Sequence, residues 1–207
     1  QTNLDNNKQM EQLNFADYTK ALNEEGELYI AQDIGDDGKK QYTCSTMKNA
    51  RIFLDNDYNL YEILKEDKPN KFYIDFDCKY NSIREFCENK KDNIIKEEII
   101  QTIEGMVEDF LIEYNIREEL PPCNVSDSSN KIKYSFHFCL DLKLKDFNHS
   151  QVFHNKFLRF LNERYSDDED YHNLHKFIDP CVYTKNRLIR LPNQSKFGQD
   201  RPLKIYK

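Results

Sequence analysis

The sequence predicts an α+β fold in which a sheet with the element order βαββαβ follows a smaller N-terminal α/β module. Two stretches, residues 71–78 and 133–140, alternate apolar and polar side chains with the period of two that strands show. A long stretch between them, residues 92–116, repeats apolar residues at the spacing of an amphipathic helix. Strand and helix patterns that alternate in this way favour helices packed on a sheet.

The N-terminal module, residues 1–68, is predicted to combine two helices with a hairpin. A Gly-Asp-Asp-Gly turn at residues 35–38 separates the two hairpin strands. The predicted elements are, in order, a helix within residues 1–25, strands at 27–31 and 41–46, and a helix that runs from about Asp57 to the break at Pro69-Asn70.

The second module, residues 69–207, is predicted to hold the βαββαβ order of a ferredoxin-like or RNA-recognition-like sheet. Its predicted elements are, in order, a strand at 71–78, a helix at 92–116, strands at 123–127 and 133–140, a helix at 149–165 and a last strand near Ile178. In a sheet of this order the first and third strands are often neighbours.

The charge of the chain is uneven along the sequence. The net charge of −7 by itself argues against a nucleic-acid partner. From Tyr183 to Lys207, however, seven basic residues accompany a single acid, Asp200. A basic strip on an acidic body is compatible with phosphate binding, although a solvated basic tail is at least as common.

Composition excludes several classes of protein. The six cysteines are scattered without Cys-x-x-Cys spacing, so we expect reduced thiols, no structural zinc site and no disulfide scaffold. No apolar run of about 18 residues occurs, so we expect no membrane partner. Reduced thiols also predict an intracellular protein. The N-terminus lacks both a methionine and a signal-peptide pattern, which predicts a piece of a longer chain.

The first predicted strand carries two acids on one face. Because side chains alternate across a strand, Asp75 and Asp77 share the face opposite Phe72, Ile74 and Phe76. Like charges about 7 Å apart repel each other, but they suit a hard cation such as Mg²⁺, which prefers carboxylate oxygens. The alternative is an edge strand with a solvated acidic face.

The strand at 133–140 places Lys133, Ser135 and His137 opposite an aromatic face. A half-exposed strand with polar outer residues explains the serine easily and the histidine less easily. If the first and third strands are neighbours, these groups lie beside Asp75 and Asp77. With Asp179 as a third acid, the set supplies what nucleotidyl transfer requires: carboxylates for two metal ions and donors for a triphosphate.

These motifs resemble the archaeo-eukaryotic primase superfamily, and most closely its PrimPol-like branch, which includes primase-polymerases of eukaryotes and primase domains of large DNA viruses. Three motifs match in order: Ile74–Asp77, Ser135–His137 with Lys133 two positions earlier, and Ile178-Asp179. Val182–Leu191 then matches the branch signature Val-Tyr-Thr-Lys-Asn-Arg-x-x-Arg-Leu, and Ser195-Lys196 matches its downstream Ser-Lys pair. The resemblance covers roughly residues 27–205 and implies the archaeo-eukaryotic primase fold.

The resemblance implies a role for each matching residue. Asp75, Asp77 and Asp179 are expected to bind the catalytic metal ions, Mg²⁺ or Mn²⁺. The residues expected to hold the incoming triphosphate are Lys133, Ser135, His137 and Arg190. The residues expected to contact nucleotide or template are Arg187, Lys196 and, near the hairpin, Lys40, which stands where the branch has an arginine. Because Arg187 and Arg190 are three residues apart, a regular strand would send them to opposite faces, and a bulge or turn would be needed to align them.

The implied function is a template-directed DNA primase or polymerase core that acts in DNA replication or damage tolerance, at a nuclear or cytoplasmic replication site. Its expected partners are single-stranded or primed DNA and nucleoside triphosphates, with a helicase domain in the same chain or in trans. Asp77 suits a viral or archaeal version of the motif, since eukaryotic relatives often carry Glu there, and viral or eukaryotic origin is expected. A zinc-binding segment commonly follows this core in relatives and is absent from the sequence, which leaves primer initiation open.

Two other functions remain open at this point. A metal-dependent nuclease could use the same acids without a grip on a triphosphate. A non-enzymatic single-strand binding module of RNA-recognition type would need stacking aromatics on the exposed face of the sheet, where this sequence predicts acids, serine and histidine instead.

Overall fold

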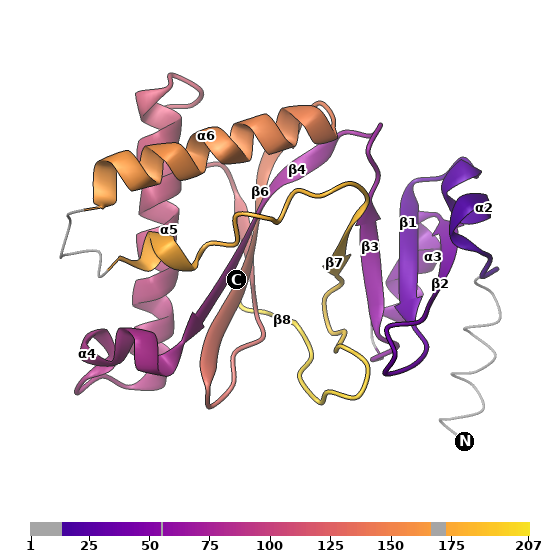
Figure 1. Cartoon of the computed structure of the whole chain (residues 1–207), viewed down its shortest axis with the longest axis horizontal. Helices are drawn as coiled ribbons and strands as arrows, with labels where there is room; N and C mark the ends of the chain where they lie inside the picture. The colour runs from indigo at the N-terminus through magenta and orange to yellow at the C-terminus, as the bar shows by residue number, and fades with distance from the viewer. Residues whose placement is uncertain (1–13, 55, 167–172) are drawn as a thin grey trace. The chain divides into compact units, whose positions relative to one another are not determined.

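The computed structural model describes residues 14–54, 56–166 and 173–207 (Figure 1). Contacts within the chain divide it into two units. The first unit holds the described residues up to Glu66 together with Lys185–Ile205. The second unit holds the described residues of Asp67–Thr184 together with Tyr206–Lys207. Each unit has its own antiparallel sheet, so the fold is of the mixed α+β class that the sequence predicts.

The sheet of the first unit has the strand order β2-β1-β3-β7. Its strands are β1 (Leu28–Asp33), β2 (Lys40–Ser45), β3 (Leu60–Leu64) and β7 (Arg187–Arg190). The predicted hairpin is confirmed, because β1 and β2 pair antiparallel in continuous register from Leu28 opposite Ser45 to Asp33 opposite Lys40. Gly38 in the connecting turn has a φ of 78°, a conformation that glycine adopts without strain.

Residues 185–205 lie in the first unit, whereas the sequence assigned them to the module 69–207. The reason is a long-range strand pairing. Strand β7 runs antiparallel to β3, from Leu64 opposite Arg187 to Tyr61 opposite Arg190. Local sequence patterns carry no information about which distant strand will pair with β7, so the division could not be predicted from them.

The predicted helix from Asp57 is wrong, because Leu60–Leu64 forms strand β3. Asn59 has a φ of 59°, which interrupts any helix just before this segment. Strand β3 is hydrogen-bonded on both sides, to β1 and to β7, so tertiary pairing overrides the local helical spacing. A helix that the sequence did not predict, α3 (Met47–Phe53), precedes it and is capped by the hydroxyl of Thr46, which accepts from the N–H of Asn49.

Only part of the predicted N-terminal helix falls within the described residues. Helix α2 (Tyr18–Asn23) is short and begins after Asp17, whose carboxylate accepts from the N–H of Lys20. Residues 1–13 lie outside the described residues.

The sheet of the second unit joins β4 (Asn70–Lys79), β6 (Lys133–Leu144) and β5 (Cys123–Asp127) in that order. The first and third strands of the predicted βαββαβ order are therefore neighbours, as the sequence predicts. The chain also returns to the edge of β5, where the N–H of Tyr206 donates to the carbonyl of Val125. The short strand β8 (Lys204–Ile205) directly precedes this contact.

Two long helices cover one face of this sheet (Figure 1). Helix α5 (Asp92–Glu113) and helix α6 (Phe147–Tyr165) match the two predicted amphipathic helices closely. Phe110 of α5 and Phe157 of α6 pack edge to face at 5.2 Å, and Phe157 packs in the same way on Phe72 of β4. These rings are fully buried, so the apolar faces of β4 and β6 are committed to the core.

The last strand predicted for this unit, near Ile178, is reduced to one bridge. Two short elements lie in this part of the unit: a 3₁₀ turn, η2 (Leu174–Phe177), and a single antiparallel bridge between Ile178 and Phe76 of β4. The connection between β4 and α5 similarly holds η1 (Tyr80–Ile83) and the single-turn α4 (Arg84–Cys87). The βαββαβ order therefore ends in a bridge rather than in a full strand.

The buried carboxylate of Asp33 provides a test of the first unit. Burial alone would raise the pKa of Asp33, but hydrogen bonds from Lys40 and from the hydroxyl of Tyr61 lower it below its usual value. We expect Asp33→Ala to lower the free energy of unfolding by about 1–3 kcal/mol, because it strands the buried Tyr61 hydroxyl. Urea unfolding at pH 7 measures this loss, with the exposed Asp36→Ala as the control.

The same variant gives a pH dependence with a definite sign. A carboxyl group whose pKa is lowered on folding contributes stability above its unfolded pKa, and this stability is lost as the pH falls through the folded value. The difference in unfolding free energy between wild type and Asp33→Ala should therefore shrink in acid. A difference that grows below pH 4 would contradict the assignment.

Candidate active site in the second unit

The register between β4 and β6 brings the predicted acids next to the predicted donors. Asp75 lies directly opposite His137, and Asp77 lies directly opposite Ser135. Residues that face each other across an antiparallel pair project to the same face, so all four side chains share the face opposite the two helices. The alternation of buried aromatic residues on the other face fixes this register, because a slip by one residue would expose the aromatic face.

The third acid reaches the same strand through the main chain. The N–H of Asp179 donates to the carbonyl of Asp75 at 2.8 Å, beside the bridge between Ile178 and Phe76. The carboxylate of Asp179 also accepts from the N–H of Cys181, at 2.8 Å. Asp179 is thus a neighbour of Asp75 in the fold, although the two residues are far apart in the sequence.

The carboxylates do not form a closed metal cluster in this structure. Among the described residues, no group of three or more His, Cys, Asp and Glu side chains is arranged to hold one ion together. The donor chemistry nevertheless suits Mg²⁺ or Mn²⁺, because Asp75 and Asp77 offer carboxylate oxygens from one strand face and Asp179 borders Asp75. These three acids remain the residues that could hold a divalent cation.

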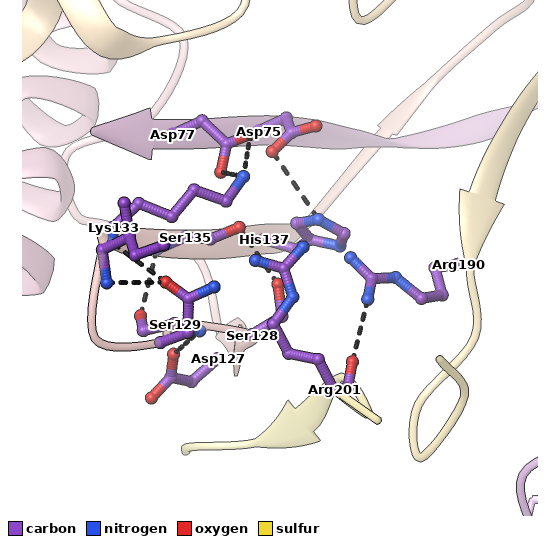
Figure 2. A network of polar contacts seen from close by, with 12 residues as sticks. Asp75, Asp77, Asp127, Ser128, Ser129, Lys133, Ser135, His137, Arg190 and Arg201 are labelled. Carbon is purple, nitrogen blue, oxygen red and sulfur yellow. Dashed lines mark hydrogen bonds and ion pairs between the residues drawn. The ribbon is translucent and has the colours of Figure 1, made fainter. Parts of the chain in front are cut away.

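A lysine from the neighbouring strand neutralises Asp77. The ammonium of Lys133 donates to both carboxylate oxygens of Asp77, at 2.7 Å each (Figure 2). Burial opposes ionisation of Asp77, but the hydrogen bonds from Lys133 and Ser135 outweigh it and hold the pKa of this carboxyl below its usual range. Asp77 is therefore ionised, as a carboxylate that binds a metal ion must be, and a metal ion at Asp77 would share or replace the Lys133 ammonium.

His137 and Asp75 form a second, more buried pair on the same face. The Nε2 atom of His137 lies 3.6 Å from a carboxylate oxygen of Asp75, and their side chains are 10% and 21% exposed. The ring of Tyr73 packs edge to face on the imidazole of His137 at 5.5 Å. These contacts hold the imidazole beside the acid and limit its rotation.

The turn between β5 and β6 is held by side-chain hydrogen bonds that the sequence analysis did not assign. The hydroxyls of Ser128 and Ser135 lie 3.0 Å apart, and the hydroxyl of Ser129 accepts from the N–H of Ser135. The carboxamide oxygen of Asn130 accepts from the N–H of Lys133. This turn therefore fixes the start of β6. In the sequence, the run of serine and asparagine at residues 128–130 indicates a turn, because such side chains often form hydrogen bonds with the nearby backbone.

The remaining predicted residues lie in the first unit. Arg187 and Arg190 are the two ends of β7, and the pairing with β3 is continuous between them. No bulge aligns the two side chains, so strand alternation sends them to opposite faces. Arg190 is buried, and its guanidinium donates to the carbonyl of Arg201 at 3.1 Å.

The Ser-Lys pair and Lys40 have structural partners in the same unit. Ser195 is buried, its N–H donates to Asp57, and its hydroxyl accepts from the N–H of Arg201. These bonds fix the loop that carries the exposed Lys196. Lys40 forms an ion pair with Asp33 across the hairpin, so in this structure its charge is already used within the sheet.

Arg201 is a residue that the sequence analysis counted only as part of the basic strip. Its side chain is half-buried, and its guanidinium makes no hydrogen bond or ion pair with any residue that the structure describes. The guanidinium of Arg190 donates a hydrogen bond to the main-chain carbonyl of Arg201. A desolvated guanidinium without an acid partner is typical of a site that awaits an anion. In the sequence, only its position shortly after the Ser-Lys pair distinguished Arg201 from the other basic residues of the strip.

The comparisons with known proteins identify the family of this chain. Residues 44–206 match the family model of the C962R protein N-terminal AEP domain. The chain belongs to this family of archaeo-eukaryotic primase domains. It is also 28% identical over 206 residues to the uncharacterized protein ORF49 of Ostreid herpesvirus 1 (isolate France). That alignment covers 84% of this chain and 17% of the viral protein, so the chain spans less than a fifth of that relative's length. No helix in the described part of the chain is both long and apolar enough to cross a membrane.

The pair of Lys133 and Asp77 can be tested directly. We expect Lys133→Ala to raise the pKa of Asp77, because the variant removes both the hydrogen bond and the charge that lower it. Carboxyl carbon chemical shifts followed through an NMR pH titration measure the change. Lys131→Ala, which removes an exposed charge from the same turn, is the matched control and should leave the Asp77 titration almost unchanged.

Proposed function

We propose that this chain is the catalytic core of a template-directed DNA primase or polymerase, which joins a nucleoside triphosphate to a 3′-hydroxyl. One observation carries the proposal: in a member of the archaeo-eukaryotic primase family, the β4–β6 register sets Asp75 and Asp77 directly opposite His137 and Ser135. Acids for cations and donors for phosphate thus alternate across two adjacent strands.

The proposed role of the second unit is to hold the reacting phosphates. Ser135, His137 and Lys133 project from one strand as a hydroxyl, an imidazole and an ammonium, which are donors suited to phosphate oxygens. Lys133 is paired with Asp77 and can serve phosphate only by sharing its charge or leaving that carboxylate. His137 in this role donates to phosphate oxygen and is not a nucleophile.

The three acids are the proposed metal ligands. A divalent cation held by Asp75, Asp77 and Asp179 would offset charge on the phosphate oxygens and favour ionisation of the attacking hydroxyl. The chain's own contribution is to keep Asp77 ionised and to hold Asp179 beside Asp75.

The first unit is proposed to grip the nucleotide and the template. The guanidinium groups of Arg190 and Arg201, joined through a main-chain contact, supply the triphosphate-binding charge. Lys196, on its fixed loop, and Arg187, on the other face of β7, are proposed to contact nucleotide or template, as is Lys40 if it exchanges its bond with Asp33. The basic strip of this overall acidic chain would then account for nucleic-acid binding.

The structure does not favour a single-strand binding module of RNA-recognition type. Such modules stack bases on aromatic residues of the exposed sheet face. Here the aromatic residues Phe72, Phe76 and Phe136 are buried in the core on the opposite face. The exposed face carries acids, which repel phosphate unless cations are bound.

The proposal predicts that Asp75→Ala combined with Asp77→Ala abolishes nucleotide incorporation. Loss of two proposed metal ligands should reduce the rate by roughly a hundredfold or more. Extension of a labelled primer with Mn²⁺ measures the rate, and thermal unfolding checks that the variant folds. Asp141→Ala removes an exposed acid from the same sheet and should retain full activity.

Two outcomes contradict the proposal. One is undiminished extension by the double variant. The other is a wild-type chain that adds no nucleotide but cleaves DNA with Mn²⁺, with the cleavage lost in the double variant. The second result would identify a nuclease that uses the same acids.

The proposed role of Arg201 gives a second prediction. Arg201→Gln should raise the KM for the nucleoside triphosphate by about tenfold, which corresponds to one lost charge-assisted hydrogen bond. Steady-state incorporation against nucleotide concentration measures it. Lys204→Gln removes the same charge from an exposed position three residues away and should leave KM unchanged. Equal effects of the two substitutions would show that Arg201 acts only through net charge.

A further inference from the structure

A buried histidine of helix α6, His154, contacts the third acid, Asp179. His154 is 1% exposed, and its Nε2 atom lies 3.1 Å from the main-chain carbonyl oxygen of Asp179. A carbonyl oxygen can only accept, so the imidazole must carry its proton on Nε2 and donate it. Burial lowers the pKa of His154, which keeps the ring neutral with a single N–H.

The surroundings of His154 are apolar and would accept a hydrocarbon side chain. The imidazole packs against the rings of Phe72, Phe157 and Tyr183, with centroids 5.3–6.4 Å away. Its other nitrogen, Nδ1, is buried and has no hydrogen-bond partner among the described residues. A half-satisfied buried imidazole costs free energy that a leucine or phenylalanine would not. The bond to Asp179 is the interaction that only a donor at this position supplies.

Asp179 is held at every polar group of its own residue. Its N–H bonds the carbonyl of Asp75, its carboxylate accepts from Cys181, and its carbonyl accepts from His154. Pro180 follows, and the residue before a proline is restricted to extended conformations. Of these restraints, the bond from His154 is the one that ties the acid to the helix layer.

The segment after Asp179 is anchored to the same strand. The hydroxyl of Tyr183 accepts from the N–H of Tyr73 at 2.7 Å, at the edge of β4. Tyr183 also packs on the imidazole of His154, 5.3 Å between centroids. The loop that carries the third acid is therefore held at two residues, Asp179 and Tyr183. His154 contacts both of them.

We propose that His154 is a positioning residue that fixes Asp179 beside Asp75 and thereby sets the affinity of the acids for a divalent cation. This inference rests on the proposed function, since it takes Asp75, Asp77 and Asp179 as the cation ligands. His154 touches neither substrate nor metal. It acts through the main chain of Asp179, and its loss lets the acid drift from Asp75 without removing a ligand.

The test measures Mn²⁺ binding directly, by the electron paramagnetic resonance signal of free Mn²⁺ in the presence of the whole chain. His154→Leu should weaken binding by roughly tenfold, in the range seen for groups that orient metal ligands. His154→Gln, whose carboxamide can still donate to the carbonyl, should recover a substantial part of the affinity. Phe160→Leu is the matched control, because Phe160 is a buried residue of the same helix whose ring packs on Phe110 and Tyr165.

The outcomes separate positioning from general packing. A Phe160→Leu variant that melts at a lower temperature but keeps the wild-type Mn²⁺ affinity, together with a His154→Leu variant that loses this affinity, supports the proposal. Equal Mn²⁺ affinities in wild type and His154→Leu overturn it, as does an equal loss of affinity in Phe160→Leu. If His154→Leu does not fold, the Mn²⁺ affinities of His154→Gln and His154→Phe are compared. Tighter binding by His154→Gln supports the proposal, and equal affinities overturn it.

The failure of this inference is distinguishable from the failure of the proposed function. Mn²⁺ binding that is lost in Asp75→Ala with Asp77→Ala but is indifferent to His154 refutes only the positioning role. Wild-type chain that binds Mn²⁺ at these acids yet incorporates no nucleotide refutes the proposed activity and leaves the role of His154 to be decided by the affinities.

Discussion

The arrangement of the candidate site depends on the antiparallel pairing of β4 with β6. Between Lys79 opposite Lys133 and Phe72 opposite Leu140 their register is continuous, and every second pair, from Cys78 with Tyr134 to Phe72 with Leu140, is buried in the core. The intervening pairs set an acid opposite a donor twice in succession. Because burial of the aromatic face determines which residues align, the positions of the polar groups follow from hydrophobic packing rather than from their own weak attraction.

On the other face of the sheet, Asp77 keeps its charge because of its neighbours on β6. Asp77 is about half exposed and has a lysine on both of its oxygens, so its pKa is lowered in spite of partial desolvation. His137 and Asp75 are more enclosed and approach each other without a short hydrogen bond. Each acid thus has one cationic or potentially cationic neighbour from β6. A sheet face of this kind presents alternating charge to any ligand that lies along it.

The sequence was a good guide wherever a residue's neighbours follow from local alternation and sheet order. The pairing of Asp75 and Asp77 with His137 and Ser135 required only two strands and their adjacency, and both were correctly predicted. Prediction failed where distant segments decide local structure. Leu60–Leu64 has helical spacing of apolar residues but forms a strand, because β1 and β7 flank it. His154 and Arg201 were missed because their significance depends on contacts with distant residues: His154 donates to the carbonyl of Asp179, and the main chain of Arg201 bonds Arg190 and Ser195.

The first unit is discontinuous in sequence, since the second unit is inserted between β3 and β7. During synthesis from the N-terminus, β3 can pair with β1 early, but its other edge must wait until the whole inserted unit has been made. Closing so long a loop carries an entropic cost that an already folded insert reduces by bringing its two ends together. The last β7 segment, with its arginines, would then join the sheet only after the acids of the insert are in place. Synthesis from the N-terminus would therefore place the acids of the inserted unit before the arginines of β7.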